Sequence, residues 1–127
     1  MTAMSQEPRI ILVDDNAVVR DMLVDLVASL GYCADAAAGG EEALALFDQG
    51  QYAIVLTDLL MPGMSGWDVL AAVRQRDAYI PVIIVTGSPV VGDPRAAQPG
   101  VAVLKKPVDV RALDSMIKRM LHLRLAV

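Results

Sequence analysis

Five polar residues stand directly after strongly apolar runs, and their types could together support phosphoryl chemistry. Asp14 and Asp15 follow RIILV, Asp58 follows YAIVLT, Thr86 follows PVIIV, and Lys106 follows VAVLK. Taken singly, an aspartate after a strand usually caps a helix or forms a turn, and a threonine or lysine there is commonly just solvated. The combination of three carboxylates, one hydroxyl and one ammonium group is what indicates a functional site.

The three carboxylates predict a bound metal ion. Carboxylates within a few ångströms repel one another, so without a cation at least one should stay protonated. Mg²⁺ prefers oxygen ligands, and proteins typically hold it with one or two carboxylates together with water and phosphate oxygens. The aspartates therefore predict a magnesium-assisted phosphoryl site, with Asp14 and Asp15 as the natural pair of metal ligands.

Asp58 is the residue best placed to receive the phosphoryl group. It stands alone between an apolar run and the turn LLMPGMSG, so its carboxylate is expected to project into the pocket. A carboxylate can attack phosphorus to form an aspartyl phosphate when a metal screens the approaching negative charges. Lys106 would neutralise a phosphoryl oxygen and Thr86 would donate a hydrogen bond. The only histidine, His122, is expected on a solvated helix face and not in the pocket.

Alternating strands and helices would bring these residues together. Short β-branched runs predict strands at 9–14, 32–37, 52–58, 81–87 and 101–106, and helical spacing predicts helices within 16–31, 39–50, 65–76 and 109–123. Short connections between them imply right-handed βαβ units and a doubly wound α/β fold, with a five-stranded parallel sheet covered on both faces. Function in such sheets lies at the carboxyl ends of the strands, where all five polar residues fall.

The helices carry signals for their ends and their buried faces. Asn16 is a suitable N-cap and Gly31 a suitable stop for the first helix, and Ser65 with Asp68 has the spacing of a capping box. Trp67 fits partial burial in the core better than a contact with a partner. The apolar faces are expected to hold Val19, Met22, Leu23, Leu26 and Leu30 in the first helix and Val110, Leu113, Ile117 and Leu121 in the last.

Residues 86–100, TGSPVVGDPRAAQPG, stand where a further helix is due. Their prolines and glycines make a regular helix there improbable. At most about one turn of helix fits around residues 93–98, between Gly92 and Pro99. The sequence thus predicts a short or irregular fourth helix, with weak amide protection across residues 88–99.

Four motifs together resemble the receiver domain of two-component response regulators. They are VDD at 13–15, LTDLLMPGMSG at 56–66, PVIIVTG at 81–87 and KKP at 105–107, in the family's order and at its spacing. The resemblance implies a flavodoxin-like sheet in the strand order 2-1-3-4-5, an order that a chemotaxis receiver exemplifies. It also implies a single receiver domain over residues 1–127, with an ordered core over about 8–123.

The resemblance implies a phosphoacceptor in a phosphorelay, and not an enzyme that turns over a separate substrate. Asp58 would take a phosphoryl group from a phosphohistidine on a sensor histidine kinase or a histidine phosphotransfer protein. Mg²⁺ would be bound by Asp15 directly, by Asp14 largely through water, by Asp58, and by the backbone carbonyl of Leu60. Phosphorylation would switch an interaction surface for an output partner.

The resemblance also assigns the remaining site residues and exposes two departures. Lys106 would be the family's lysine, before a cis bond to Pro107, and Thr86 would move toward the phosphoryl oxygens. Val103 stands where many relatives carry an aromatic residue coupled to the threonine, so that coupling cannot operate here in its usual form. Leu60 is apolar where many relatives are polar, along the route of a hydrolytic water, and is expected to alter the lifetime of the phosphorylated state.

Composition limits the other function classes. The 127 residues suit one domain, and 55% apolar with 20% charged residues argues against disorder. No apolar run approaches membrane-spanning length, and a net charge of −4 argues against direct nucleic-acid binding. Cys33, the only cysteine, fits a reducing cytoplasm. We expect a cytoplasmic protein that is a monomer or weak dimer.

Two other functions remain open on the sequence alone. One is a magnesium-dependent phosphatase with an aspartyl nucleophile, although such enzymes carry D-x-D after the first strand, whereas Asp14 and Asp15 are adjacent, and the chain has no room for a substrate cap. The other is a receiver that serves only as an interaction module, although all five key residues are present. The chain could equally be a single-domain regulator or a receiver from a longer protein such as a hybrid kinase.

Overall fold

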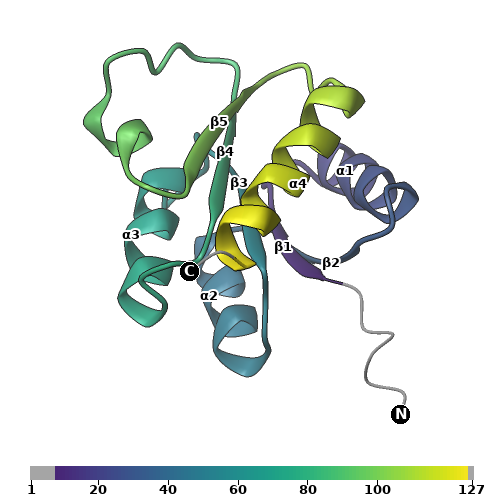
Figure 1. Cartoon of the computed structure of the whole chain (residues 1–127), viewed down its shortest axis with the longest axis horizontal. Coiled ribbons are helices and arrows are strands. Elements are labelled where there is room, and N and C mark those ends of the chain that lie inside the picture. Colours follow the sequence, from purple (N-terminus) through teal and green to yellow (C-terminus); the bar gives the residue numbers. More distant parts are fainter. Residues whose placement is uncertain (1–7, 126–127) are drawn as a thin grey trace.

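Five apolar segments form one parallel sheet in the computed structural model, which describes residues 8–125. The strands are β1 (Arg9–Val13), β2 (Cys33–Ala37), β3 (Ile54–Asp58), β4 (Val82–Thr86) and β5 (Val101–Lys105). They pair in the order β2-β1-β3-β4-β5, and every neighbouring pair is parallel. The predicted fold class and strand order are confirmed, and all five carboxyl ends therefore lie along one edge (Figure 1).

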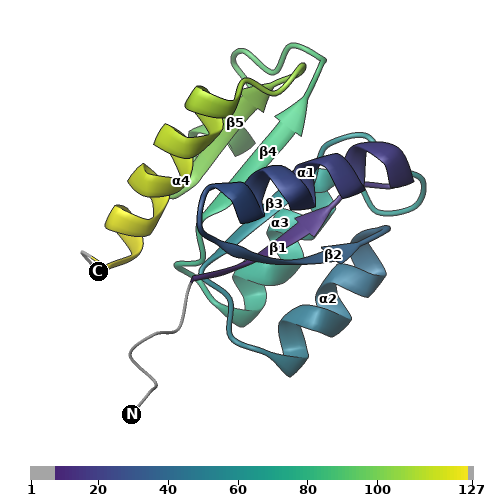
Figure 2. The same cartoon turned by 90° about the vertical axis from the view of Figure 1, so that its right-hand side faces the viewer.

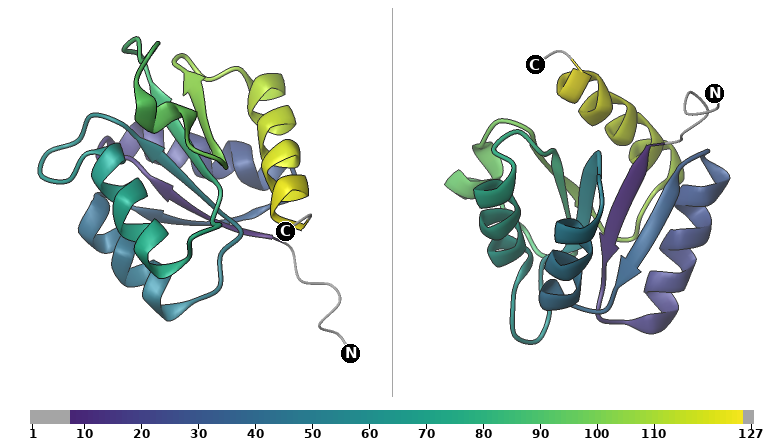
Figure 3. Two further views of the ribbon diagram at one scale, coloured as in Figure 1. Left: turned by 60° about the vertical axis from the view of Figure 1, so that its left-hand side comes forward. Right: turned by 90° about the horizontal axis from the view of Figure 1, so that it is seen from below.

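Helices cover both faces of this sheet. Helices α1 (Ala17–Ser29) and α4 (Val110–Leu125) lie on one face, and α2 (Gly40–Gln49) and α3 (Gly66–Arg76) lie on the other (Figures 1 and 2). The right panel of Figure 3 shows the sheet between these two layers. Because successive side chains of a strand point to opposite faces, Ile10 and Leu12 join the core under α1 and α4, whereas Ile11 and Val13 pack under α2.

The helix ends follow the predicted capping signals. The side chain of Asn16 accepts a hydrogen bond from the backbone N–H of Val19, 3.0 Å away, and caps α1. Ser65 and Asp68 form the predicted capping box at the start of α3. Gly31 follows α1 with φ at 96°, a conformation that glycine adopts without strain.

Two members of the predicted apolar helix faces are not buried. Met22 is 55% exposed and Val110 is 40% exposed. The buried stripe of α1 instead runs through Leu23 and Val27, which are four residues apart and lie above one another on a helix. Met22 is one residue, or about 100°, away from that stripe. Val110 opens the first turn of α4, one turn before the fully buried Leu113.

The segment between β4 and β5 contains no α-helix (upper left of Figure 1). Its only helical part is η2 (Pro94–Ala97), a 3-10 turn within the predicted range, and Asp93 caps it by accepting from the backbone N–H of Arg95. Two side chains of α3, those of Arg74 and Trp67, anchor the segment. The guanidinium of Arg74 donates a hydrogen bond to the carbonyl of Pro99 at 2.8 Å, and the ring centre of Trp67 lies 4.6 Å from the guanidinium of Arg95 in the segment. The predicted irregular fourth helix is confirmed.

Two other side chains lie as predicted. Trp67 packs partly buried against the core beneath α3, and His122 is exposed. Among residues 8–125, no helix combines the length and the apolar character that crossing a membrane requires.

Candidate functional site

Three aspartates meet at the carboxyl edge of the sheet. In the pairing of β1 with β3, Val13 lies opposite Thr57, so Asp14, which follows β1, and Asp58, which ends β3, are neighbours. One carboxylate oxygen from each of Asp14, Asp15 and Asp58 lies within 4.8 Å of the other two. Asp14 and Asp58 are buried and Asp15 is exposed, so the cluster has one side open to solvent.

Lys106 completes the charged cluster. Its Nζ lies 3.2 Å from Oδ1 of Asp58 and 4.0 Å from Oδ2 of Asp14. Its backbone N–H donates to the carbonyl of Thr86, which ties the end of β5 to the end of β4, and the bond to Pro107 is cis, as the resemblance implied. The adjacent Lys105 is exposed at the end of β5.

The surroundings of Asp14 favour a bound cation. Burial is the main cause that raises the pKa of Asp14 above its ordinary value, and the charge of Asp58 acts in the same direction. A hydrogen bond from the backbone N–H of Asn16 to Oδ1 of Asp14 at 2.9 Å and the charge of Lys106 oppose that rise. The donor set consists of carboxylate oxygens, one of them on the open side, which fits the ligands that Mg²⁺ prefers.

Thr86 and Leu60 lie at the same edge but outside the charged cluster. The buried Thr86 ends β4, and its hydroxyl accepts a hydrogen bond from the backbone N–H of Ser88 at 3.0 Å. Leu60, two residues after Asp58, is 66% exposed. Within residues 8–125, no hydrogen bond occupies the carbonyl of Leu60, which would leave it available as a metal ligand.

Gly66 was missed as a site residue by the sequence reasoning, which treated it only as the start of a helix. A Cβ at this position would lie 2.5 Å from the carbonyl oxygen of Asp58 and 2.9 Å from Cα of Leu59. The backbone N–H of Gly66 donates to the carbonyl of Leu59 at 2.8 Å. Glycine thus lets α3 dock directly on the backbone that carries Asp58, and its place after the capping Ser65 was the available signal.

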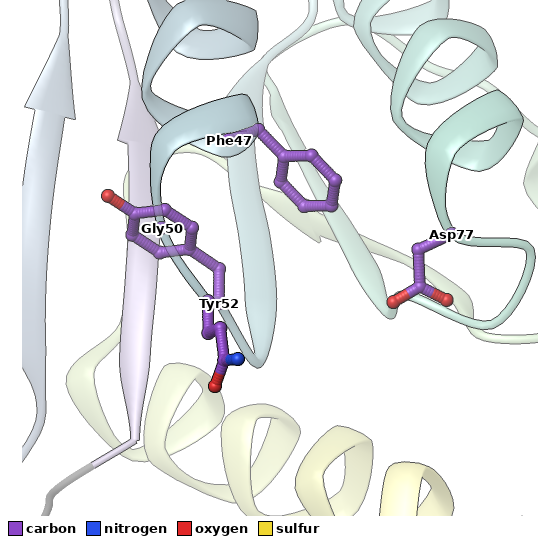
Figure 4. A pocket seen from close by; sticks show the side chains of 5 residues that line it. Phe47, Gly50, Tyr52 and Asp77 are labelled. Atoms are coloured by element: carbon purple, nitrogen blue, oxygen red, sulfur yellow. The ribbon is translucent and has the colours of Figure 1, made fainter.

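A separate hollow opens at the opposite edge of the sheet. It is lined by Phe47, Gly50, Gln51, Tyr52 and Asp77 (Figure 4). The side chain of Asp77 accepts from the backbone N–H of Tyr79, and the hydroxyl of Tyr52 donates to Asp35. The clustered acids lie instead at the carboxyl edge, which remains the candidate site.

Comparisons with known proteins give matches over most of the chain. The model of the response regulator receiver domain matches residues 10–118. The chain is 32% identical over 114 residues to the transcriptional regulatory protein TcrA of Mycobacterium tuberculosis, covering 88% of this chain and 44% of TcrA. It is 36% identical over 110 residues to the sensor histidine kinase RcsC of Salmonella typhi, covering 85% of this chain and 12% of RcsC. The chain spans less than half the length of these relatives.

Solved structures share the fold over nearly the whole chain. A CheY-like response regulator receiver domain protein from Methanospirillum hungatei superposes with a TM-score of 0.87 at 27% identity, over 95% of this chain and 98% of the other. The response regulator TrrA from Thermotoga maritima, solved in complex with Mg²⁺-BeF, superposes with a TM-score of 0.82 at 30% identity, over 89% of this chain and 98% of TrrA.

Proposed function

This chain belongs to the response regulator receiver domains of two-component systems, and from that premise we propose that it is a phosphoacceptor whose Asp58 takes a phosphoryl group from a phosphohistidine. One observation carries the proposal. At the carboxyl edge of the sheet, the carboxylate of Asp58 lies among those of Asp14 and Asp15 and 3.2 Å from Nζ of Lys106. Such an arrangement offers a nucleophile, a cation site and a fixed positive charge in one place.

We assign Oδ2 of Asp58 as the attacking oxygen. Oδ1 accepts a hydrogen bond from the backbone N–H of Leu59 at 2.9 Å and faces Lys106, whereas no hydrogen bond within residues 8–125 ends on Oδ2. In the transfer, Oδ2 bonds to phosphorus while the bond from phosphorus to the imidazole nitrogen of the donor breaks. The electron pair of that bond stays on the nitrogen. Asp58 attacks as a carboxylate, so no base is needed to remove a proton from it.

Two other side chains would act on the phosphoryl oxygens. Lys106 would neutralise one of them, and the hydroxyl of Thr86 would donate a hydrogen bond to another. When bound, Mg²⁺ would screen the negative charges, and Asp14, Asp15, Asp58 and the carbonyl of Leu60 would hold it.

The test is phosphorylation of the full chain with acetyl phosphate in the presence of Mg²⁺. We expect the mass of one phosphoryl group to be added, and borohydride reduction followed by peptide mapping to place it on residue 58. Asp58→Asn should abolish the adduct, and chelation of Mg²⁺ should reduce it strongly. Asp114→Asn, which removes a carboxylate from the surface of α4, serves as the matched control and should leave the adduct intact.

The same assay, extended to other phosphate donors, separates the alternative functions. Steady release of phosphate from varied phosphate esters would favour a phosphatase. No adduct from either acetyl phosphate or a phosphohistidine protein would favour a module that acts only through interactions, and would contradict the proposal.

Output is proposed to pass through the segment between β4 and β5. The Thr86 hydroxyl accepts from the Ser88 amide at the start of this segment, so a motion of Thr86 toward the phosphoryl group would change that bond directly. Val103, on β5 beside the segment, has no aromatic ring to transmit the motion. A sensor histidine kinase or histidine phosphotransfer protein is the proposed donor, and the binding partner of the segment is a protein that recognises its altered conformation.

A further inference from the structure

Arg20, the fourth residue of α1, contacts the backbone of Asp14, and the motifs of the sequence give Arg20 no role. Its Nη1 donates a hydrogen bond to the backbone carbonyl of Asp14 at 2.8 Å, in partly buried surroundings. Its own backbone N–H donates to the carbonyl of Asn16, the N-cap residue of α1. Arg20 therefore connects the start of α1 to Asp14, the residue that follows β1 and carries one carboxylate of the cluster.

The contact engages a polar group that the sheet leaves unpaired. The backbone N–H of Asp14 still donates to Ala37 at the end of β2, but β1 itself ends at Val13. A buried carbonyl without a partner is costly, and the guanidinium of Arg20 satisfies it. Oδ1 of Asp14 accepts from the Asn16 amide and Oδ2 lies 4.0 Å from Nζ of Lys106, so both carboxylate oxygens have a polar or charged neighbour.

Fixing this carbonyl also fixes the start of Asp15. The carbonyl of Asp14, the amide nitrogen of Asp15 and Cα of Asp15 lie in one plane because the peptide bond is planar. Arg20 thus sets the direction in which the chain leaves Asp14, and with it the place from which the exposed carboxylate of Asp15 reaches the cluster.

We propose that Arg20 is a positioning residue that orients the Asp14–Asp15 peptide and thereby sets the affinity of the aspartate cluster for a divalent cation. The inference rests on the proposed function, since it concerns the cation that would assist phosphorylation of Asp58. Arg20 touches neither the cation nor the phosphoryl group in this scheme, and acts through the peptide that it holds.

The test measures Mg²⁺ binding to the full chain by titration calorimetry. Loss of a partner that orients metal ligands typically weakens metal binding, so we expect Arg20→Met to raise the Kd for Mg²⁺ about tenfold. Arg20→Lys retains the charge and a donor and should recover part of the affinity. Arg119→Met removes the same charge from an exposed position on α4 and should leave the Kd unchanged. The backbone amide resonance of Asp15 should move in Arg20→Met and not in Arg119→Met.

The outcomes separate this inference from the proposed function. Wild-type Mg²⁺ affinity in Arg20→Met would overturn the inference, even where urea unfolding shows the variant to be less stable, because Arg20 would then be only structural. An adduct on Asp58 in the wild type alongside that result would leave the proposed function standing. If the wild type binds no Mg²⁺, both fall. Should Arg20→Met not fold, Arg20→Gln, which also removes the charge, takes its place under the same criteria.

Discussion

Adjacent residues of the same type occupy different surroundings at this site. Asp14 is buried and hydrogen-bonded, whereas the neighbouring Asp15 is exposed on the open side of the cluster. Lys105 is exposed at the end of β5, whereas Lys106 reaches Asp58. Successive side chains at the end of a strand point to opposite faces of the sheet, which is consistent with Lys106 reaching Asp58 while Lys105 stays exposed. Asp14 and Asp15 both contribute an oxygen to the cluster and differ instead in burial, so one lies inside the site and the other on its open side.

The exposed Leu60 leads to a prediction about the lifetime of the phosphorylated state. Leu60 follows Asp58 by two residues, and its exposed apolar side chain offers an approaching water no hydrogen bond. Leu60→Asn would supply a polar group, and one hydrogen bond contributes about 1 kcal/mol. If that bond forms only in the transition state, dephosphorylation should become about fivefold faster. The decay of the adduct, followed by mass spectrometry after removal of acetyl phosphate, measures this rate.

Leu60→Met is the control for that measurement, because it keeps an apolar side chain of similar volume and should decay like the wild type. A rate in Leu60→Asn equal to that of the wild type would show that this position does not govern the lifetime.

Most elements follow from local sequence patterns, and the failures have a physical cause. The strands were predicted because β-branched runs such as IILV and VIIV are buried on both faces of a parallel sheet. Met22 was misplaced because a helical pattern rich in apolar residues allows more than one buried stripe, and packing against the sheet decides which one is used. The prolines predicted the irregular segment. Its anchoring by Arg74 and Trp67 could not be predicted, because it depends on contacts between distant parts of the chain.

The segment between β4 and β5 should exchange its amide hydrogens rapidly in the unphosphorylated protein. The hydrogen bonds that its backbone amides donate are few and local, such as those from the N–H of Asp93 to the carbonyl of Val90 and from the N–H of Ala96 to the carbonyl of Asp93. Segments with few buried contacts open at low cost in free energy. Hydrogen exchange followed by mass spectrometry should show weak or absent protection across residues 88–99 and strong protection in β4 and β3, which are fully buried.

Beryllofluoride with Mg²⁺ should change exchange in this segment more than in α2, if the segment is the output surface. Stable, complete protection across residues 88–99 in the unphosphorylated protein would contradict the first expectation. An unchanged pattern after beryllofluoride would contradict the second.

At the scale of the whole molecule, topology explains why the site could be predicted at all. A parallel sheet sends every carboxyl end to one edge, so residues more than 90 positions apart in the chain, such as Asp14 and Lys106, meet there. The strand-end residues were therefore predictable as a group. Arg20 and Gly66 were not, because one acts through a side-chain contact to a backbone carbonyl and the other through the absence of a side chain.

The concentration of carboxylates at one edge predicts that Mg²⁺ stabilises the whole fold. A ligand that binds only the native state at about 100 times its Kd adds about 2.7 kcal/mol to the free energy of unfolding. For a domain of this size the Tm should then rise by about 10 °C. Asp15→Asn should lose most of that rise, while its metal-free Tm should not fall, because one of three repelling charges is gone.

Thermal unfolding followed by circular dichroism, with and without Mg²⁺, measures both effects. NaCl at matched ionic strength is the control, because general screening of the −4 net charge would also act through salt. An equal rise in Tm with NaCl, or an undiminished rise with Mg²⁺ in Asp15→Asn, would contradict a specific site at the aspartates. A rise that is confined to Mg²⁺ and to the intact cluster would instead tie the stability of the fold to the same carboxylates that are proposed to assist phosphoryl transfer to Asp58.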